Sequence, residues 1–337
     1  MKNAESLSTR NPIVLGPFIL DGVAMLAPMS GVSDLAMRRI ARRFGAALVF
    51  SEMVAAETYL DGDTEAATRA EGEGVFPHAV QLVGREPSAL AETARRIEGA
   101  GAQIIDINMG CPARRVSGAL AGAALMRDLD HAERIIATVV AAVSVPVTVK
   151  MRLGWDEASL NAPELAGRAE RAGAQMVTVH GRTRQQFYDG RADWRAARGV
   201  VEAVAIPVLI NGDCATAEDA RAMIAQSGAS GVMVGRAALG APWLVGAISR
   251  ALSAGAPLRP PSRAAQSEAA IEHLEWLLAR LGSRAGLRHA RKHLAAYAGA
   301  AGAPAPVRRE LVTTEDPQLA RKLLAAAFEM LPAKAAA

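Results

Sequence analysis

The feature that most constrains the fold of this chain is a series of short apolar runs that recur roughly every 25–35 residues. Most of these runs are continuous rather than alternating, which is typical of strands that are buried on both faces of a parallel sheet. We therefore predict eight strands, which are Val23–Ala27, Ala47–Phe50, Ala79–Leu82, Ile104–Ile107, Pro146–Val149, Met176–Val179, Pro207–Ile210 and Gly231–Val234.

Helical patterns lie between most of these strands, and Ser88 and Asp130 are suited to cap two of the helices. The predicted helices are Ser88–Ala100, Asp130–Val143, Pro163–Ala172, Trp194–Val204 and Ala217–Gln226. Strands that alternate with helices predict an α/β fold, a (β/α)8 TIM barrel, over residues 13–250. The alternative is an open doubly wound sheet, which is disfavoured because no Gly-x-Gly-x-x-Gly segment follows an early strand.

The pattern changes after the eighth strand. Residues 251–266 include a stretch rich in Ala, Gly and Pro, which predicts a linker. Residues 267–337 are predicted to form a small helical domain of three or four helices, and residues 1–12 an N-terminal tail. The predicted helices of this domain are Ser267–Leu281, Gly286–Ala298 and Pro317–Leu331, with a loop at Ala300–Pro306.

Composition limits the class of protein. The chain has 337 residues, of which 51% are hydrophobic, so it can bury a large core. Its two cysteines, Cys111 and Cys214, exclude a disulfide framework and favour a reducing compartment. The six histidines show no zinc-binding spacing, and we expect no metal. Without a secretory signal or an apolar run near the roughly 20 residues of a membrane span, we expect a cytoplasmic protein.

The charge is unevenly distributed along the chain. Residues 246–337 carry 13 Lys and Arg against 7 Asp and Glu, whereas the whole chain has a net charge of +4. The remainder is therefore mildly acidic, and the basic C-terminal segment is suited to contact a polyanion. The alternative interpretation is that its arginines only keep the helices soluble.

Polar residues follow seven of the eight predicted strands, and in a (β/α)8 barrel the ends of the strands meet on one face. This convergence predicts an active site. A lone cysteine is usually a buried, inert side chain. Cys111, however, lies between Gly110 and Pro112, where a strand must end, so we expect its thiol at the mouth of the barrel.

Asn211-Gly212-Asp213 and Gly235-Arg236 follow the seventh and eighth strands, which is the usual phosphate-binding position of this fold. Glycine lets backbone N–H groups approach a phosphate, and arginine adds a charged fork. Pro28-Met29 is suited to lie against a flat ring, and Gln81 and Lys150 to meet its polar atoms. Together these residues fit flavin mononucleotide (FMN).

Several segments together resemble the tRNA-dihydrouridine synthases, and most closely their bacterial B type. The resemblance covers about residues 13–250 and continues weakly into Arg291-Lys292-His293-Leu294. The segments that carry it are Ala27–Asp34, Asp106–Pro112, Val149–Arg152, Val179–Arg184, Ala192–Trp194, Asn211–Asp213 and Gly235–Arg236.

This resemblance implies an enzyme that reduces the C5=C6 bond of a uridine in the tRNA D-loop, with tightly bound FMN that NADPH re-reduces. Cys111 would be the catalytic acid, and Asn108 and Arg182 would hold the uracil. The basic helices would grip the tRNA, with Arg288, Arg291 and Lys292 as candidate contacts. The implied FMN-binding residues are Pro28, Met29, Ser30, Gln81, Lys150, Asn211, Gly212, Asp213, Gly235 and Arg236, with His180 near the phosphate.

The implied chemistry explains the choice of a thiol. Hydride from flavin N5 goes to the electrophilic C6 of uracil, and C5 must then receive a proton. A general acid that supplies this proton raises the rate by roughly 10²–10⁴-fold. The thiol must stay protonated to act, so a pKa near or above about 8.5 suits it. A thiolate nucleophile would need the opposite shift.

Two other functions remain as alternatives. One is a flavin oxidoreductase for free pyrimidines or dihydroorotate, which would not explain the basic helical tail. The other is a non-enzymatic RNA-binding protein on an inactive barrel, which the presence of Cys111, Lys150 and Asn108 argues against.

Overall fold

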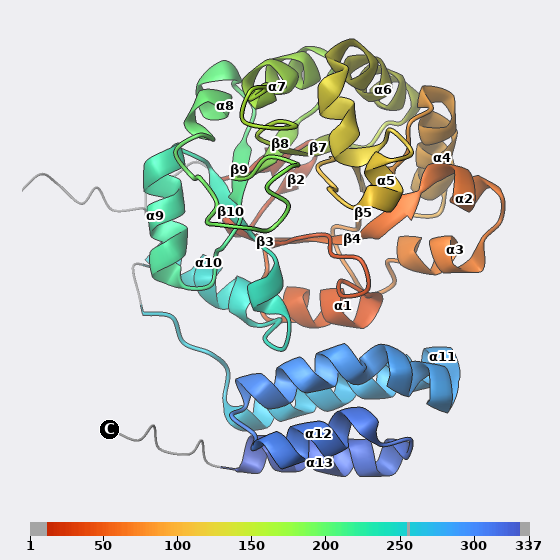
Figure 1. The fold of residues 1–337 in the computed structure, drawn as a ribbon, viewed down its shortest axis with the longest axis vertical. Helices are drawn as coiled ribbons and strands as arrows, with labels where there is room; N and C mark the ends of the chain where they lie inside the picture. The colour runs from red at the N-terminus through yellow and green to blue at the C-terminus, as the bar shows by residue number, and fades with distance from the viewer. Residues whose placement is uncertain (1–11, 255–256, 331–337) are drawn as a thin grey trace, which may run out of the picture.

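Eight parallel strands close into a barrel in a computed structural model that describes residues 12–254 and 257–330 (Figure 1). Around the barrel the order is β10-β3-β4-β5-β6-β7-β8-β9. The predicted TIM barrel is confirmed, and the open-sheet alternative is wrong. The strands are β3 (Ala24–Leu26), β4 (Leu48–Ala55), β5 (Ala79–Val83), β6 (Ile104–Met109), β7 (Val147–Arg152), β8 (Met176–His180), β9 (Val208–Asn211) and β10 (Gly231–Val234).

Helices surround the barrel and cover the outer faces of its strands (Figure 1). Two of the predicted caps are wrong. α4 begins one residue before Ser88, because Pro87 occupies its first turn, where its fixed φ favours a helix. The cap of α6 is Asp128 rather than Asp130, and its carboxylate accepts a hydrogen bond from the backbone N–H of His131. The α-helices are α1 (Leu35–Arg43), α2 (Ala56–Leu60), α3 (Thr64–Ala70), α4 (Pro87–Gly99), α5 (Arg114–Ser117), α6 (Leu129–Ala142), α7 (Ala162–Arg171), α8 (Arg198–Ala203), α9 (Ala217–Ser227) and α10 (Leu244–Ala254), with 3-10 turns η2 (Gly122–Arg127) and η3 (Arg236–Ala238).

A small hairpin that the sequence did not predict precedes the barrel. Its strands are β1 (Val14–Leu15) and β2 (Phe18–Ile19). Ile13, Leu15 and Leu20 are buried in one cluster with residues at the amino ends of the barrel strands. The hairpin thus closes the end of the barrel opposite the carboxyl ends of its strands. Of the predicted tail, residues 1–11 lie outside the described residues.

The C-terminal residues form a helical domain below the barrel (Figure 1). Its first element, α11 (Arg263–Ala300), breaks at Gly282, whose φ of 75° and ψ of 166° are not helical. The two halves of α11 are antiparallel, because His273 in the first half hydrogen-bonds to Tyr297 in the second. α12 (Ala305–Thr313) and α13 (Pro317–Glu329) complete the described part of the domain.

The boundaries differ from the prediction in two places. α10 extends to Ala254, into the stretch 251–266 that we predicted as a linker, and α11 already begins at Arg263. Residues 255 and 256 of the linker and 331–337 of the helical domain lie outside the described residues. α12 begins inside the predicted loop, because Pro304 and Pro306 flank the start of a helix rather than interrupt one.

The helical domain packs against the barrel through a shared apolar cluster. Ile40 of α1 and Trp243, just before α10, belong to the same cluster as the buried residues of α11 and α13. Trp243 stacks on Tyr297 with ring centroids 6.0 Å apart. Beside the cluster, Arg43 and Glu272 form an ion pair of 2.6 Å. In the described part of the chain, every helix is too short or too polar to span a membrane.

Candidate active site

A cavity of about 890 Å³ lies at the carboxyl ends of the barrel strands. Its volume is in the range of small-molecule and cofactor sites, about 300–1,000 Å³. Most of the predicted site residues line it, and four do not: Arg182, Arg288, Arg291 and Lys292. The predicted residues that line the cavity are Pro28, Met29, Ser30, Gln81, Asn108, Cys111, Lys150, His180, Asn211, Gly212, Asp213, Gly235 and Arg236.

A chain of side-chain hydrogen bonds crosses the cavity floor from β7 to β5. It starts at Asp106, a buried carboxylate on β6 that accepts from Thr148 Oγ1 and from Gln81 Nε2, each at 2.6 Å. Burial raises the pKa of Asp106 to about 6, and the hydrogen bonds from Thr148 and Gln81 oppose that shift. Because both donors point at Asp106, the amide of Gln81 is held in one orientation.

The same chain continues to the loop that carries the thiol. Asn108 Nδ2 donates to Gln81 Oε1 at 2.8 Å. Asn108 Oδ1 then accepts from the backbone N–H groups of Gly110 and Cys111, at 3.1 and 2.9 Å. Asn108 therefore fixes the backbone at Cys111. Its Nδ2 also lies 4.0 Å from the sulfur of Met53.

The thiol of Cys111 is half-buried on the cavity wall. Burial raises its pKa above the ordinary value, and the N–H of Ala113 and the charges of Arg152 and Lys150 oppose the shift without reversing it. Arg152 also holds the loop, since its Nε donates to the carbonyl of Gly110 at 2.8 Å. The side chain is thus a protonated thiol near neutral pH.

Lys150 on β7 places a partly buried ammonium in the cavity. Its Nζ donates to Asn211 Oδ1 at 3.1 Å, and Asn211 Nδ2 in turn donates to the carbonyl of Met233 at 2.8 Å. Burial and the nearby charge of Arg152 together lower the pKa of Lys150 to about 8. A partly buried ammonium of this kind can stabilise negative charge that develops beside it.

The backbone after β9 requires glycine, whereas the backbone after β10 is open to the cavity. Gly212 has a φ of +121°, and a Cβ there would meet the Cβ of Ala192 at 2.7 Å. Trp194 fixes this turn, because its Nε1 donates to the carbonyl of Gly212 at 2.9 Å. At Gly235 a Cβ would instead project into open cavity, 3.9 Å from the nearest atoms. The wall therefore has a bare backbone at the predicted phosphate position.

His180 lies beside this turn, and its Cε1 is 3.4 Å from where a Cβ of Gly212 would be. Its Nδ1 is buried and has no hydrogen-bond partner among the described residues. Burial and the charge of Lys150 hold the pKa of His180 well below its usual range. A neutral imidazole with an unused nitrogen is consistent with a missing ligand in the cavity.

Arg182 does not occupy the position predicted for it. Its side chain is 1% exposed and is absent from the cavity wall. The guanidinium binds both oxygens of Asp213, at 3.2 and 2.6 Å, and the carbonyls of Asp189 and Gly190. A buried guanidinium needs such partners, and this carboxylate supplies the strongest. Arg182 therefore braces the loops around the cavity rather than reaching a uracil.

The carboxylate of Asp213 likewise forms ion pairs with arginines. Besides Arg182, it accepts from Arg236 Nη2 at 3.0 Å and from the backbone N–H of Ala192 at 2.9 Å. The pKa of Asp213 is lowered by these partners despite its partial burial. Its carboxylate orients Arg236, whose side chain is 63% exposed and remains accessible to an anion.

Sequence reasoning missed an aromatic pair on the cavity wall. Phe187 and Tyr188 line the cavity, are 41% and 46% exposed, and pack edge to face with centroids 4.8 Å apart. The guanidinium groups of Arg152 and Arg236 lie over Tyr188, at 5.6 and 5.2 Å. The available signal was an aromatic pair in the polar stretch that follows β8.

Lys292 and Arg291 lie on α11 beside the barrel. The Nζ of Lys292 is 3.0 Å from where a Cβ of Gly31 would stand, so it reaches the loop that begins with Pro28. Arg291 Nε is buried and has no hydrogen-bond partner among the described residues.

The closed barrel and the cavity at the carboxyl ends of its strands are the arrangement of TIM-barrel enzymes. Two solved structures share this fold at low sequence identity. Histamine dehydrogenase from Rhizobium sp. 4-9 aligns with a TM-score of 0.57 at 13% identity, over 96% of this chain and 64% of that chain. Morphinone reductase aligns with a TM-score of 0.52 at 16% identity, over 77% and 92%.

Within this class the chain belongs to the dihydrouridine synthase family. The family model described as "Dihydrouridine synthase (Dus)" matches residues 25–331. The "Probable tRNA-dihydrouridine synthase" of Rhodobacter capsulatus is 51% identical over 94% of this chain and 98% of its own length. The "tRNA-dihydrouridine synthase B" of Xanthomonas campestris pv. campestris is 44% identical over 84% and 86%. The resemblance predicted from the sequence is confirmed.

Proposed function

We propose that this chain is a cytoplasmic tRNA-dihydrouridine synthase that reduces the C5=C6 bond of a uridine in the tRNA D-loop. Residues 13–250 would bind FMN and carry out catalysis, and residues 267–337 would bind the tRNA. Family membership and the names of the relatives support the reaction class. The observation that carries the mechanism is a thiol of raised pKa on the wall of the same cavity as Lys150 and the bare backbone at Gly235.

The cavity has the features that FMN would need. Gly235 leaves a space that a Cβ would fill, and His180 has a buried nitrogen with no partner in the part of the chain that the structure describes. Gly212, Gly235, Arg236 and His180 would hold the phosphate, whereas Met29, Gln81, Lys150 and Asn211 would face the ring. When bound, FMN would supply the hydride and would be recharged by NADPH.

The residues of the chain would then handle the proton and the base. Cys111 would donate its proton to C5, with its loop held by Asn108 and Arg152. Phe187 and Tyr188 present exposed rings on the cavity wall, and base–aromatic stacking contributes about 1–3 kcal/mol per base. They would receive a uridine that has left its stack, an event with a cost of a few kcal/mol.

Basic groups outside the cavity would hold the rest of the tRNA. Arg291 and Lys292 lie on the helical domain at its boundary with the barrel. Phosphate contacts there would offset the energy of extruding the base, and this contribution would decrease with salt.

The test is to give the FMN-loaded protein NADPH with either an unmodified tRNA transcript or free uracil, and to measure the reduced product. We expect dihydrouridine in the tRNA and no turnover of free uracil. Reduction of free uracil alone would favour the free-pyrimidine alternative. A purified protein that is colourless and cannot be reconstituted with FMN would favour the non-enzymatic one.

A further inference from the structure

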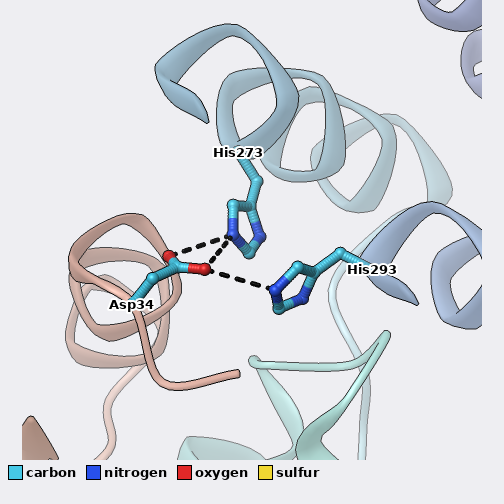
Figure 2. Close-up of side chains that lie close together, drawn as sticks. All are labelled: Asp34, His273 and His293. Carbon is cyan, nitrogen blue, oxygen red and sulfur yellow. Dashed lines mark hydrogen bonds and ion pairs between the residues drawn. The ribbon is translucent and has the colours of Figure 1, made fainter. Parts of the chain in front are cut away.

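Asp34, His273 and His293 meet in a buried cluster between the barrel and the helical domain (Figure 2). Asp34 caps α1 of the barrel, whereas His273 and His293 come from the two antiparallel halves of α11. Their exposed fractions are 7%, 1% and 1%. The cluster lies outside the cavity described above and has no part in the proposed reaction.

The distances in this cluster match a tetrahedral metal site. His273 Nε2 lies 3.1 Å from both oxygens of Asp34, and His293 Nε2 lies 3.2 Å from Oδ2. Zinc binds imidazole nitrogen and carboxylate oxygen at about 2.0–2.2 Å, which places tetrahedral ligand atoms about 3.3–3.5 Å apart. A shift of a few tenths of an ångström would therefore accommodate the ion.

Hydrogen bonds alone do not account for His293. Neither of its ring nitrogens has a hydrogen-bond partner among the described residues, although the ring is almost fully buried. Its Nε2 lies 3.2 Å from Asp34 Oδ2, with which it forms an ion pair when the ring is protonated, and the rest of the ring is buried.

The groups around the cluster are consistent with a ligand set. Asp34 Oδ1 accepts from the backbone N–H of Met37 at 3.0 Å, which orients the carboxylate. The ring of His273 is oriented through Nδ1, which lies 3.0 Å from Tyr297 Oη. Such outer contacts are usual for metal-bound histidines. Arg38, one turn further along α1, donates to backbone carbonyls of Ser33 and Glu71 rather than to Asp34.

His289 provides a fourth group. It stands one helical turn before His293, so both rings are on the same face of α11. Its Nε2 lies 4.0 Å from Asp34 Oδ2 and is buried without a hydrogen-bond partner among the described residues.

We propose that Asp34, His273 and His293 bind a divalent transition-metal ion of the Zn²⁺ type, with His289 completing the site. The ion would replace the proton that His273 Nε2 shares with Asp34, because a ligating nitrogen must be deprotonated. It would join α1 to both halves of α11 and so fix the helical domain on the barrel. Sequence spacing does not reveal this cluster, because Asp34 lies 239 residues before His273.

The test uses the full-length protein, stripped with a chelator and titrated with Zn²⁺ by calorimetry. We expect one ion per chain and, for His293→Gln, an affinity lower by more than about 100-fold, since losing even an outer contact weakens metal sites by about 10–100-fold. Glutamine keeps a donor for Asp34 but is a poor zinc ligand. His131→Gln is the matched control, because His131 on α6 bonds the carbonyl of Arg85 far from the cluster.

X-ray absorption of the zinc-loaded wild type keeps the proposal testable if the variant does not fold. We expect a shell of nitrogen and oxygen atoms at about 2.0–2.2 Å with imidazole scattering. Sulfur in that shell would place the ion on a cysteine and overturn the proposal. Failure of the wild type to bind one Zn²⁺, or unchanged affinity in His293→Gln, would also overturn it, leaving the cluster a network of hydrogen bonds alone.

Discussion

At the scale of single residues, the state of Cys111 follows from where its loop lies. Burial raises the pKa of the thiol. The charges of Arg152 and Lys150 lower this pKa, but by less than burial raises it. The net effect is a raised pKa, whereas nucleophilic cysteines are activated by a lowered pKa. A proton donor is therefore the role that this environment favours.

The first prediction concerns the pH dependence of this thiol. Only the thiolate reacts with iodoacetamide, so the alkylation rate of Cys111 should rise with pH through a midpoint above about 8.5, the ordinary cysteine value. Cys214 should stay silent over this range, since burial raises its pKa to about 12. Cys111→Ala supplies the background rate. A midpoint near 7 would mean that the thiol is a poised nucleophile.

The second prediction concerns Asp106. Its carboxylate determines which end of the Gln81 amide, and then of the Asn108 amide, faces each hydrogen-bond partner. In Asp106→Asn the new amide can turn Gln81 and then Asn108, so that Asn108 no longer accepts from the Cys111 backbone. A misplaced catalytic group can lose about 10²-fold, and we expect a fall of about 10- to 10²-fold in the single-turnover rate.

Thr148→Val is the matched control for that variant. It removes one donor to Asp106 but leaves the orientation of both amides unchanged, so its effect should be smaller. Equal rates for Asp106→Asn and the wild type would show that the chain of hydrogen bonds has no positioning role.

Much of the site could be predicted, because many residues of the cavity wall lie near or just after the carboxyl end of a strand that the sequence marks. What could not be predicted is how those residues share partners. Arg182 pairs with Asp213 only because two loops after β8 and β9 meet in space. The Phe187–Tyr188 pair likewise depends on the path of a loop that no periodic pattern describes.

At the scale of elements, strands were predicted well because continuous apolar runs and the glycines after helices are local signals. The hairpin β1–β2 was missed because its strands have two residues each, too few for a pattern. The sequence predicts two helices, Ser267–Leu281 and Gly286–Ala298, and the break in α11 at Gly282 lies between them. Its geometry, however, depends on the pairing of the two halves.

The third prediction tests that break. Gly282 has a φ and ψ that only glycine adopts readily, so Gly282→Ala should destabilise the protein by about 1–3 kcal/mol. Gly299→Ala is the matched control, since Gly299 lies inside the helical second half and both sites have open space around a new Cβ. That variant should gain up to about 1 kcal/mol.

Thermal unfolding of the full chain, followed by circular dichroism, measures both variants. The midpoint should fall for Gly282→Ala and stay or rise for Gly299→Ala. Shifts of the same sign and size would argue that position 282 lies in continuous helix.

At the scale of the whole molecule, the helical domain is held on the α1 side of the barrel. The stacked Trp243 and Tyr297, the Arg43–Glu272 pair and the Asp34 cluster all lie in this interface. This arrangement brings Lys292 to the loop at Gly31, on the rim of the cavity. One of the basic residues counted along the sequence, Lys292, thus lies beside the proposed site of reaction.

The fourth prediction follows from that position. Neutralising Arg291 and Lys292 together to alanine should weaken tRNA binding and make its salt dependence shallower by about 1 for each lost phosphate contact. Arg95→Ala with Arg96→Ala removes the same charge from α4, where both arginines already pair with Glu92, and should leave the slope unchanged. Dissociation constants at several salt concentrations measure the effect. If the salt dependence of tRNA binding has the same slope in both double variants, Arg291 and Lys292 do not contact tRNA phosphates.

The most direct test of the account is the single-turnover reduction of tRNA by Cys111→Ala carrying reduced FMN. We predict that the variant stays yellow when oxidised and binds tRNA like the wild type. Its formation of dihydrouridine should fall by about 10²–10⁴-fold, the range expected for the loss of a general acid. A rate equal to that of the wild type, with flavin and tRNA bound, would contradict the role assigned to Cys111.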